Sequence, residues 1–330
     1  MQDPSSQTRA DLDKTDGTKP VFRVSGITRT HSLVTDGYTT YKAVLKGRML
    51  DSDDRLSKPV TGDIVSGTLH DDLFVISEIK PRRSLLERKS SGKTSDLQPI
   101  AANVDMVLIV IDINRITNPH MLERYLSIVH GSGAEPVVVI SKADLGDDPE
   151  LTMDIVKAIH GNVRTVLSSH MREPYYDEVE ALFAPDMTVV LVGPSGSGKS
   201  TLSNHIMKCE LQSTSEVDDI GEGRHTTTSS RLLETPFKGY LIDTPGMREV
   251  LLDKADLSAT FDDITSLSKD CRFNDCTHTH EPGCAVRKAI EEGMLESTRL
   301  SSYQRLLREQ IAHEKRRLVK ERQANKNRKR

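Results

Sequence analysis

Long hydrophobic runs are absent from this chain of 330 residues. No stretch approaches the ~20 consecutive apolar residues that a membrane-spanning helix needs. Residues 1–20 contain no hydrophobic segment, so they do not resemble a secretory signal. We therefore expect a cytoplasmic protein with no membrane association. Residues 1–19 are polar, and we expect them to form a disordered extension.

Cysteine is also scarce. The chain has four cysteines, three of them within residues 271–284, while Cys209 stands apart and is expected to be a buried or incidental thiol. Because thiols stay reduced in the cytoplasm, clustered cysteines there indicate a metal site before a disulfide.

The clustered cysteines lie in CRFNDCTHTHEPGC, over residues 271–284. Three thiolates and an imidazole form a standard closed ligand set for structural Zn²⁺, which holds a small domain together and leaves no open position for chemistry. His280 is a competing ligand, two residues beyond the first histidine. We expect one zinc ion, bound by Cys271, Cys276, His278 and Cys284.

The net charge of −4 conceals a basic end of the chain. From Lys315 to Arg330 most residues are Lys or Arg, and Glu321 is the only acid. Such a tail indicates a polyanionic partner, although a solvated helix end has the same composition.

The stretch MTVVLVGPSGSGKST (187–201) has the strongest motif. An apolar strand-like run leads into glycines and then into a helical pattern, as G-x-x-x-x-G-K-[ST] requires. The glycines bring backbone N–H groups onto phosphate oxygens, Lys199 reaches the β- and γ-phosphates, and Ser200 binds Mg²⁺. The predicted phosphate-binding residues are Gly193, Pro194, Ser195, Gly196, Ser197, Gly198, Lys199, Ser200 and Thr201.

A second tetrapeptide, Ser141-Lys142-Ala143-Asp144, follows the apolar run VVVI. A carboxylate at Asp144 can accept hydrogen bonds from N1–H and the exocyclic amine of guanine, whereas adenine presents the wrong pattern. The Lys142 stem can pack along the purine plane. A helix-capping Asp is the alternative for the tetrapeptide alone. Ser168 and Ser169, after VRTVL, occupy the position where a backbone N–H would meet the guanine O6.

Two further segments complete the expected nucleotide site. Asp243 and Gly246 belong to DTPG after the strand-like GYLI, and they are predicted to hold the Mg²⁺ shell and the γ-phosphate. Upstream lies GRHTTT (223–228), in which one of three threonines can complete Mg²⁺ coordination; we favour Thr227.

The catalytic group is the least defined part of this site. Many GTPases place a water-orienting Gln after the DxxG glycine, and here that position is Met247. Slow unaided hydrolysis is therefore expected. His225 is a candidate for positioning water, with a polar surface residue as the alternative, and Arg224 is a weaker candidate for stabilising charge.

The order of these motifs is circularly permuted, because the base-reading segments precede the phosphate loop. Residues 20–84 contain short alternating strands that suit an OB-fold barrel, and 84–96 is expected to be a flexible linker or a mobile loop. From Ile100, β and α patterns alternate, as in a parallel sheet. We expect an α/β P-loop GTPase domain, flanked by an N-terminal all-β OB-fold barrel and a C-terminal zinc-binding, mainly helical domain, with boundaries 20–97, 98–250 and 251–330.

These segments together resemble the circularly permuted small-ribosomal-subunit biogenesis GTPases of the RsgA/YjeQ type. The resemblance is carried by PIAANVDMVLIV, SKAD, GPSGSGKST, GRHTTT, DTPG and CRFNDCTHTHEPGCAV, and it spans about residues 20–310. It implies binding to the small subunit near its rRNA decoding region, ribosome-stimulated hydrolysis of GTP to GDP, and late subunit maturation. The family usually has Asn where this chain has Ser141, which implies weaker nucleotide binding. His225 matches the family's suspected water-positioning histidine.

Two other classes of protein compete with this interpretation. A metabolic P-loop enzyme that phosphorylates a small molecule needs neither the base-reading Asp nor the flanking modules. An RNA-binding protein with a vestigial nucleotide site is supported only by Ser141 and Met247. We therefore expect a monomeric GTPase whose partners are the small ribosomal subunit, its rRNA and the guanine nucleotides.

Overall fold

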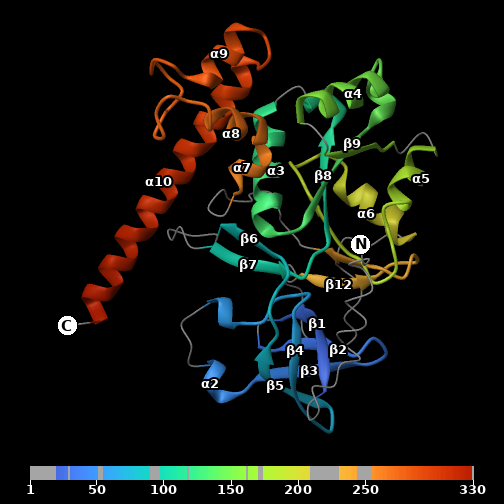
Figure 1. Cartoon of the computed structure of the whole chain (residues 1–330). Coiled ribbons are helices and arrows are strands. Elements are labelled where there is room, and N and C mark those ends of the chain that lie inside the picture. Colours follow the sequence, from blue (N-terminus) through green and yellow to red (C-terminus); the bar gives the residue numbers. More distant parts are fainter. Residues whose placement is uncertain are drawn as a thin grey trace. The chain divides into compact units, whose positions relative to one another are not determined.

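The computed structural model describes residues 20–28, 30–50, 55–89, 97–116, 119–160, 163–169, 174–208, 230–243 and 255–328. The chain forms two compact units, one of residues 1–117 and 132–250, the other of residues 118–131 and 251–330 (Figure 1). Within the described ranges, no helix combines the length and apolarity needed to cross a bilayer.

Five strands near the N-terminus form a closed barrel in the first unit (Figure 1). The strand order is β1-β2-β3-β5-β4, and β4 pairs back with β1. Alternate residues point inward, and Phe22, Val34 and Phe74 are among the side chains that fill the core. The expected OB-fold barrel is confirmed. The strands are β1 (Val21–Ile27), β2 (Ser32–Thr35), β3 (Thr40–Leu45), β4 (Ile64–His70) and β5 (Leu73–Ile79); two short helices are α2 (Gly47–Leu50) and η1 (Arg55–Ser57).

A two-stranded hairpin follows the barrel. It consists of β6 (Leu85–Lys89) and β7 (Leu97–Ala102), which pair antiparallel. The expectation of a linker over 84–96 was therefore wrong for residues 85–89. Leu86 is buried and the strand is paired along its length, so the polar composition of the segment did not prevent strand formation.

The central sheet has the order β10-β9-β8-β11-β13, with all four neighbouring pairs parallel. Its middle strand, β8, is buried at all seven positions, which explains its continuous apolar sequence. The strands are β8 (Met106–Asp112), β9 (Glu135–Ser141), β10 (Arg164–Leu167), β11 (Thr188–Val192) and β13 (Tyr240–Asp243). The helices of this unit are α4 (Pro149–His160), α5 (Pro174–Glu180) and α6 (Lys199–Met207), with short turns η2 (Ile113–Arg115) and η3 (Ala143–Leu145).

A further strand, β12 (Arg231–Glu234), joins the sheet to the barrel. It runs antiparallel to β13, and its first residue, Arg231, pairs with Gly26 of β1. Barrel and central sheet therefore form one sheet of eleven strands. Arg23 crosses this junction: it donates to Thr188 Oγ1 and lies 4.8 Å from the centre of the Tyr240 ring. Burial lowers its pKa to about 10.

Within the described residues, the second unit consists of helices and the loops between them. The helices are α3 (Pro119–Ser132), α7 (Leu257–Thr260), α8 (Asp262–Ser268), α9 (Ala285–Glu291) and α10 (Ser297–Arg328). Although α3 connects β8 to β9 in sequence, its residues up to Gly131 cluster with the C-terminal helices. Arg299 of α10 explains part of this association, because it contacts Glu123 of α3 and Asp263 of α8.

Candidate nucleotide site and metal centre

The phosphate loop begins at the carboxyl end of β11. Gly193 has φ +141°, and a Cβ there would lie 2.2 Å from the carbonyl oxygen of Val110, so only glycine fits. Gly196 and Gly198 also have positive φ values, of 78° and 83°. Helix α6 starts at Lys199, so Ser200 and Thr201 lie in its first turn with their N–H groups at the positive end of the helix dipole.

Two side chains, those of Lys199 and Ser141, donate hydrogen bonds to carbonyl oxygens of this loop. Lys199 Nζ donates to the carbonyl oxygens of Gly193 and Pro194, at 2.8 and 2.7 Å. Ser141 Oγ donates to the carbonyl oxygen of Ser197 over 2.7 Å. The short side chain at 141 therefore still reaches the phosphate loop, because β9 brings its last residue close to it.

The predicted base-reading residues lie together. Ser169 Oγ donates to Asp144 Oδ1 over 2.6 Å, and the backbone N–H of Ala143 donates to the carbonyl oxygen of Ser168 over 3.1 Å. Ser168 and Ser169 are buried, whereas Asp144 is half-buried. These bonds fix the carboxylate of Asp144 in orientation, as selective recognition of a base edge requires.

Asp112 and Arg115, which were not predicted from the sequence, also belong to this cluster. Lys142 has φ +56°, and its Nζ donates to Asp112 Oδ2 over 2.6 Å. Burial alone would raise the pKa of Asp112, but hydrogen bonds from Lys142 and the Asn114 backbone hold it below its usual value. Arg115 donates to the carbonyl oxygen of Ser195 over 3.1 Å. The signal for Asp112 was its place at the carboxyl end of a buried parallel strand, where such sheets bind ligands.

Asp243 is the last residue of β13. Since β13 is parallel to β11 with Val190 opposite Ile242, Asp243 reaches the same edge of the sheet as the phosphate loop. The other predicted residues lie outside the described ranges: Arg224, His225, Thr227, Gly246, Met247 and also Cys209.

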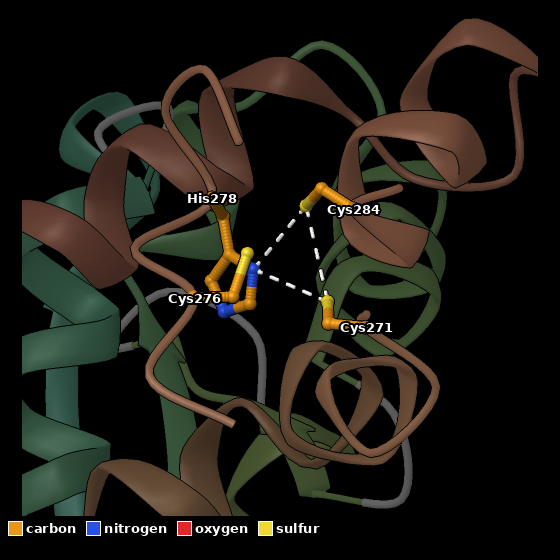
Figure 2. Close-up of side chains that lie close together, drawn as sticks. All are labelled: Cys271, Cys276, His278 and Cys284. Carbon is orange, nitrogen blue, oxygen red and sulfur yellow. Dashed lines mark hydrogen bonds between the residues drawn. The ribbon is translucent and has the colours of Figure 1, made fainter. Parts of the chain in front are cut away.

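The four predicted metal ligands lie together in the second unit (Figure 2). One ligand atom from each of Cys271, Cys276, His278 and Cys284 lies within 4.8 Å of all the others. His278 Nδ1 is 3.4 Å from Cys284 Sγ and 3.7 Å from Cys271 Sγ. Among the described residues the cluster does not include His280, which is exposed.

The surroundings of His278 suit a metal ligand. Ser268 Oγ donates to the carbonyl oxygen of Ile264, so it can accept from His278 Nε2–H, which lies 3.1 Å away. That tautomer leaves the lone pair on Nδ1, the atom facing the cysteines. Burial lowers the pKa of His278, which favours the neutral imidazole that binds metal. This donor set fits a tetrahedral cation such as Zn²⁺.

Comparison with known proteins relates the chain to one family. Residues 79–253 match the family profile described as RsgA GTPase. A protein of Lactiplantibacillus plantarum, "Small ribosomal subunit biogenesis GTPase RsgA 2", is 42% identical over 253 residues, covering 76% of this chain and 72% of that protein. A Methanosarcina acetivorans protein of the same description, "Small ribosomal subunit biogenesis GTPase RsgA", is 39% identical over 272 residues, covering 80% and 73%.

Solved structures share the fold. YjeQ from Thermotoga maritima superimposes with a TM-score of 0.68 at 24% identity, covering 89% of this chain and 99% of that one. YloQ, described as a circularly permuted GTPase, gives 0.66 at 22% identity, covering 90% and 97%. The permuted order of motifs in this chain agrees with the description of YloQ. The chain belongs to the RsgA GTPase family.

Proposed function

We propose that this GTPase binds the small ribosomal subunit, and that the subunit stimulates GTP hydrolysis, which drives late subunit maturation and release of the protein. The observation that supports the nucleotide-binding part of the proposal is the hydrogen bond from Ser141 to Ser197, which joins the segment assigned to base recognition to the phosphate loop. The names of the relatives at about 40% identity supply the ribosomal partner. The protein then acts as a cytoplasmic monomer with rRNA as its polyanionic ligand.

In the nucleotide site, we assign guanine recognition to Asp144, aligned by Ser169. Lys199 leaves the loop carbonyls for the β- and γ-phosphates when GTP binds. Ser200, Thr227 and Asp243 would hold the magnesium ion, which neutralises charge on the phosphates. His225 would orient water, and Met247 explains why hydrolysis waits for a partner.

In the second unit, we assign one structural Zn²⁺ to the four clustered ligands. Bound by these residues, the ion would crosslink the loop carrying His278 to the start of α9, where Cys284 caps the helix. Gln304 of α10 donates to the carbonyl oxygens of Thr277 and His278, so the long helix depends on the same crosslink.

The test combines binding and turnover. Purified small subunits are sedimented with the protein in GTP, in GDP and without nucleotide, and hydrolysis is measured with and without subunits. We expect the strongest binding with GTP and a higher rate with subunits. Equal binding in all three states, or an unchanged rate, would refute the proposal. Asp144→Asn should shift preference from GTP toward xanthosine triphosphate, whereas Asp147→Asn, at an exposed position nearby, serves as the matched control.

A further inference from the structure

Asp112 and Lys142 meet at the carboxyl ends of two neighbouring strands. Strands β8 and β9 are parallel with Asp112 opposite Ser141, so Lys142 comes directly after the residue that faces Asp112. Lys142 Nζ donates to Asp112 Oδ2 over 2.6 Å. The side chain of Asp112 is 10% exposed and that of Lys142 is 39% exposed. The carboxylate is therefore largely shielded from water, which strengthens the ion pair, while part of the lysine remains accessible to a ligand.

The other carboxylate oxygen of Asp112 also has a partner. Asp112 Oδ1 accepts the backbone N–H of Asn114 over 3.0 Å and thereby caps the short turn η2. Because each oxygen holds a different donor, the carboxylate cannot rotate without losing a hydrogen bond. Asp112 is thus a fixed anchor for the ammonium group of Lys142.

The backbone of Lys142 has an uncommon conformation. Its φ of 56° and ψ of 41° lie in the left-handed region, which is strained for a residue with a side chain. The carbonyl oxygen of Lys142 accepts the N–H of Leu145 over 2.9 Å, and the N–H of Ala143 donates to Ser168 over 3.1 Å. Contacts of the backbone and the bond to Asp112 thus hold Lys142 at both ends, as is typical of strained residues at ligand-binding positions.

We propose that Asp112 is a positioning residue for guanine: by binding the ammonium group of Lys142, it orders the lysine stem before the base binds. This inference rests on the proposed recognition of guanine by Lys142 and Asp144. A lysine stem is long and flexible, so it loses rotational freedom when a base packs along it. With Asp112 in place, that freedom is already lost in the unliganded protein, and the nucleotide binds to an ordered side chain. In this role Asp112 acts through Lys142 and touches no atom of the nucleotide.

The test is the affinity of the full-length protein for fluorescent GTP and GDP analogues, measured at one Mg²⁺ concentration. Asp112→Asn removes the negative charge but keeps a side-chain oxygen that can accept the N–H of Asn114. We expect it to weaken GTP and GDP binding equally, by about fivefold, because one long side chain must then be ordered on binding and the base is common to both nucleotides. If Asp112→Asn does not fold, Asp112→Ser keeps a capping oxygen and should show the same loss.

A double-mutant cycle distinguishes an effect through Lys142 from a general disturbance of the site. Lys142→Met keeps an unbranched stem and removes the ammonium group, so it should also weaken binding of both nucleotides. Adding Asp112→Asn to Lys142→Met should cause no further loss, since the partner of Asp112 is already absent. In Arg115→Ala, Asp112→Asn should keep its full effect, because Arg115 reaches the phosphate loop through the carbonyl oxygen of Ser195 and not through Lys142.

The matched control is Asp105→Asn. Asp105 lies just before the opposite end of β8, its side chain is 14% exposed, and it pairs with Arg83 over 3.0 Å. Loss of this ion pair should lower stability against urea as Asp112→Asn does. Both nucleotide affinities should nevertheless stay within about twofold of wild type, because well-separated sites act independently.

Wild-type affinities in the folded Asp112→Asn protein would overturn the inference. So would unequal losses for GTP and GDP, a further loss when Asp112→Asn is added to Lys142→Met, disappearance of the Asp112→Asn effect in Arg115→Ala, or an equal loss in Asp105→Asn. Failure of the proposed function has a different signature. Wild-type GTP affinity in Lys142→Met would contradict the guanine assignment and the inference together, whereas small subunits that do not stimulate hydrolysis would contradict the ribosomal role and change none of these affinities.

Discussion

Replacing Glu123 by glutamine should stabilise the second unit at neutral pH, although it removes one half of a buried ion pair. Glu123 on α3 is fully buried, and Arg299 of α10 donates to its Oε1 over 3.3 Å. Burial nevertheless raises the pKa of Glu123 to about 6, despite the opposing effects of Ser302 and Arg299. The penalty for burying the negative charge is therefore larger than the attraction of its partner.

The direction of the pKa shift of Glu123 sets the sign of the pH effect on stability. A raised carboxyl pKa means that the folded state holds its proton to higher pH than the unfolded state, whose pKa is near 4.5. The stabilisation is complete below about pH 4.5 and is lost as the pH rises through about 6. The pKa of Glu123 differs by about 1.5 between the folded and unfolded states, which corresponds to about 2 kcal/mol in the free energy of unfolding.

Glutamine resembles the protonated carboxyl group at every pH. The Glu123→Gln protein should therefore match wild type near pH 4 and exceed it by about 2 kcal/mol at pH 7. Breaking a buried pair usually costs about 3–5 kcal/mol, because the remaining charge is stranded. Arg299 is not stranded here, since it keeps two hydrogen bonds to Asp263 and one of 2.9 Å to the carbonyl oxygen of Thr260.

Substitution of the partner residue, Arg299, should have the opposite effect on stability. Arg299→Gln leaves Glu123 and Asp263 without their shared cation, so it should lose about 3–5 kcal/mol at pH 7. Urea unfolding is followed by hydrogen exchange of α3 and α10, with mass-spectrometric detection and zinc present at each pH. Comparing variants at equal pH cancels the contribution of thiol titration. A less stable Glu123→Gln protein at pH 7, or a difference that is the same at every pH, would refute the reasoning.

The other two predictions concern the two candidate sites. Cys276→Ser should abolish binding of one Zn²⁺ per chain and unfold α8 and α9 without loss of the barrel, because the metal crosslink supplies much of the folding free energy of so small a unit. Zinc content and hydrogen exchange measure these two effects. Zinc binding equal to that of the His280→Ala control would contradict the prediction. Ser141→Ala should weaken GTP binding about tenfold by leaving the carbonyl oxygen of Ser197 unsatisfied. Titration with a fluorescent GTP analogue measures the affinity. Unchanged affinity would show that the contact does not organise the phosphate loop.

Much of the fold could be predicted because its signals are local. The alternation of β and α patterns from Ile100 predicted the parallel sheet, and the buried strand β8 is a continuous apolar run. Strand β12 was missed because RLLE is short and only half-buried, so no period is visible in it. Strand β6 was missed because its polar residues resemble a linker, although pairing with β7 decides its conformation.

Contacts within one short segment could also be predicted from the sequence, whereas contacts between distant segments could not. Cys271, Cys276 and Cys284 were predictable, because their ligand spacing lies within one short segment. The contact between Thr61 and Ser230 spans 169 positions, and nothing in either neighbourhood marks it. Such a contact follows from strand order, which depends on packing of the whole sheet and not on any local pattern.

The discontinuous second unit has a consequence for synthesis. Helix α3 leaves the ribosome before every other helix of that unit, because the chain must first be made from Ser132 to Leu257. Until then Glu123 lacks Arg299, and the backbone carbonyl of Ser127 lacks the N–H of Asp256. During synthesis α3 therefore lies between two strands of the sheet without its packing partners. The second unit can complete its folding only after the last 74 described residues, 255–328, have emerged.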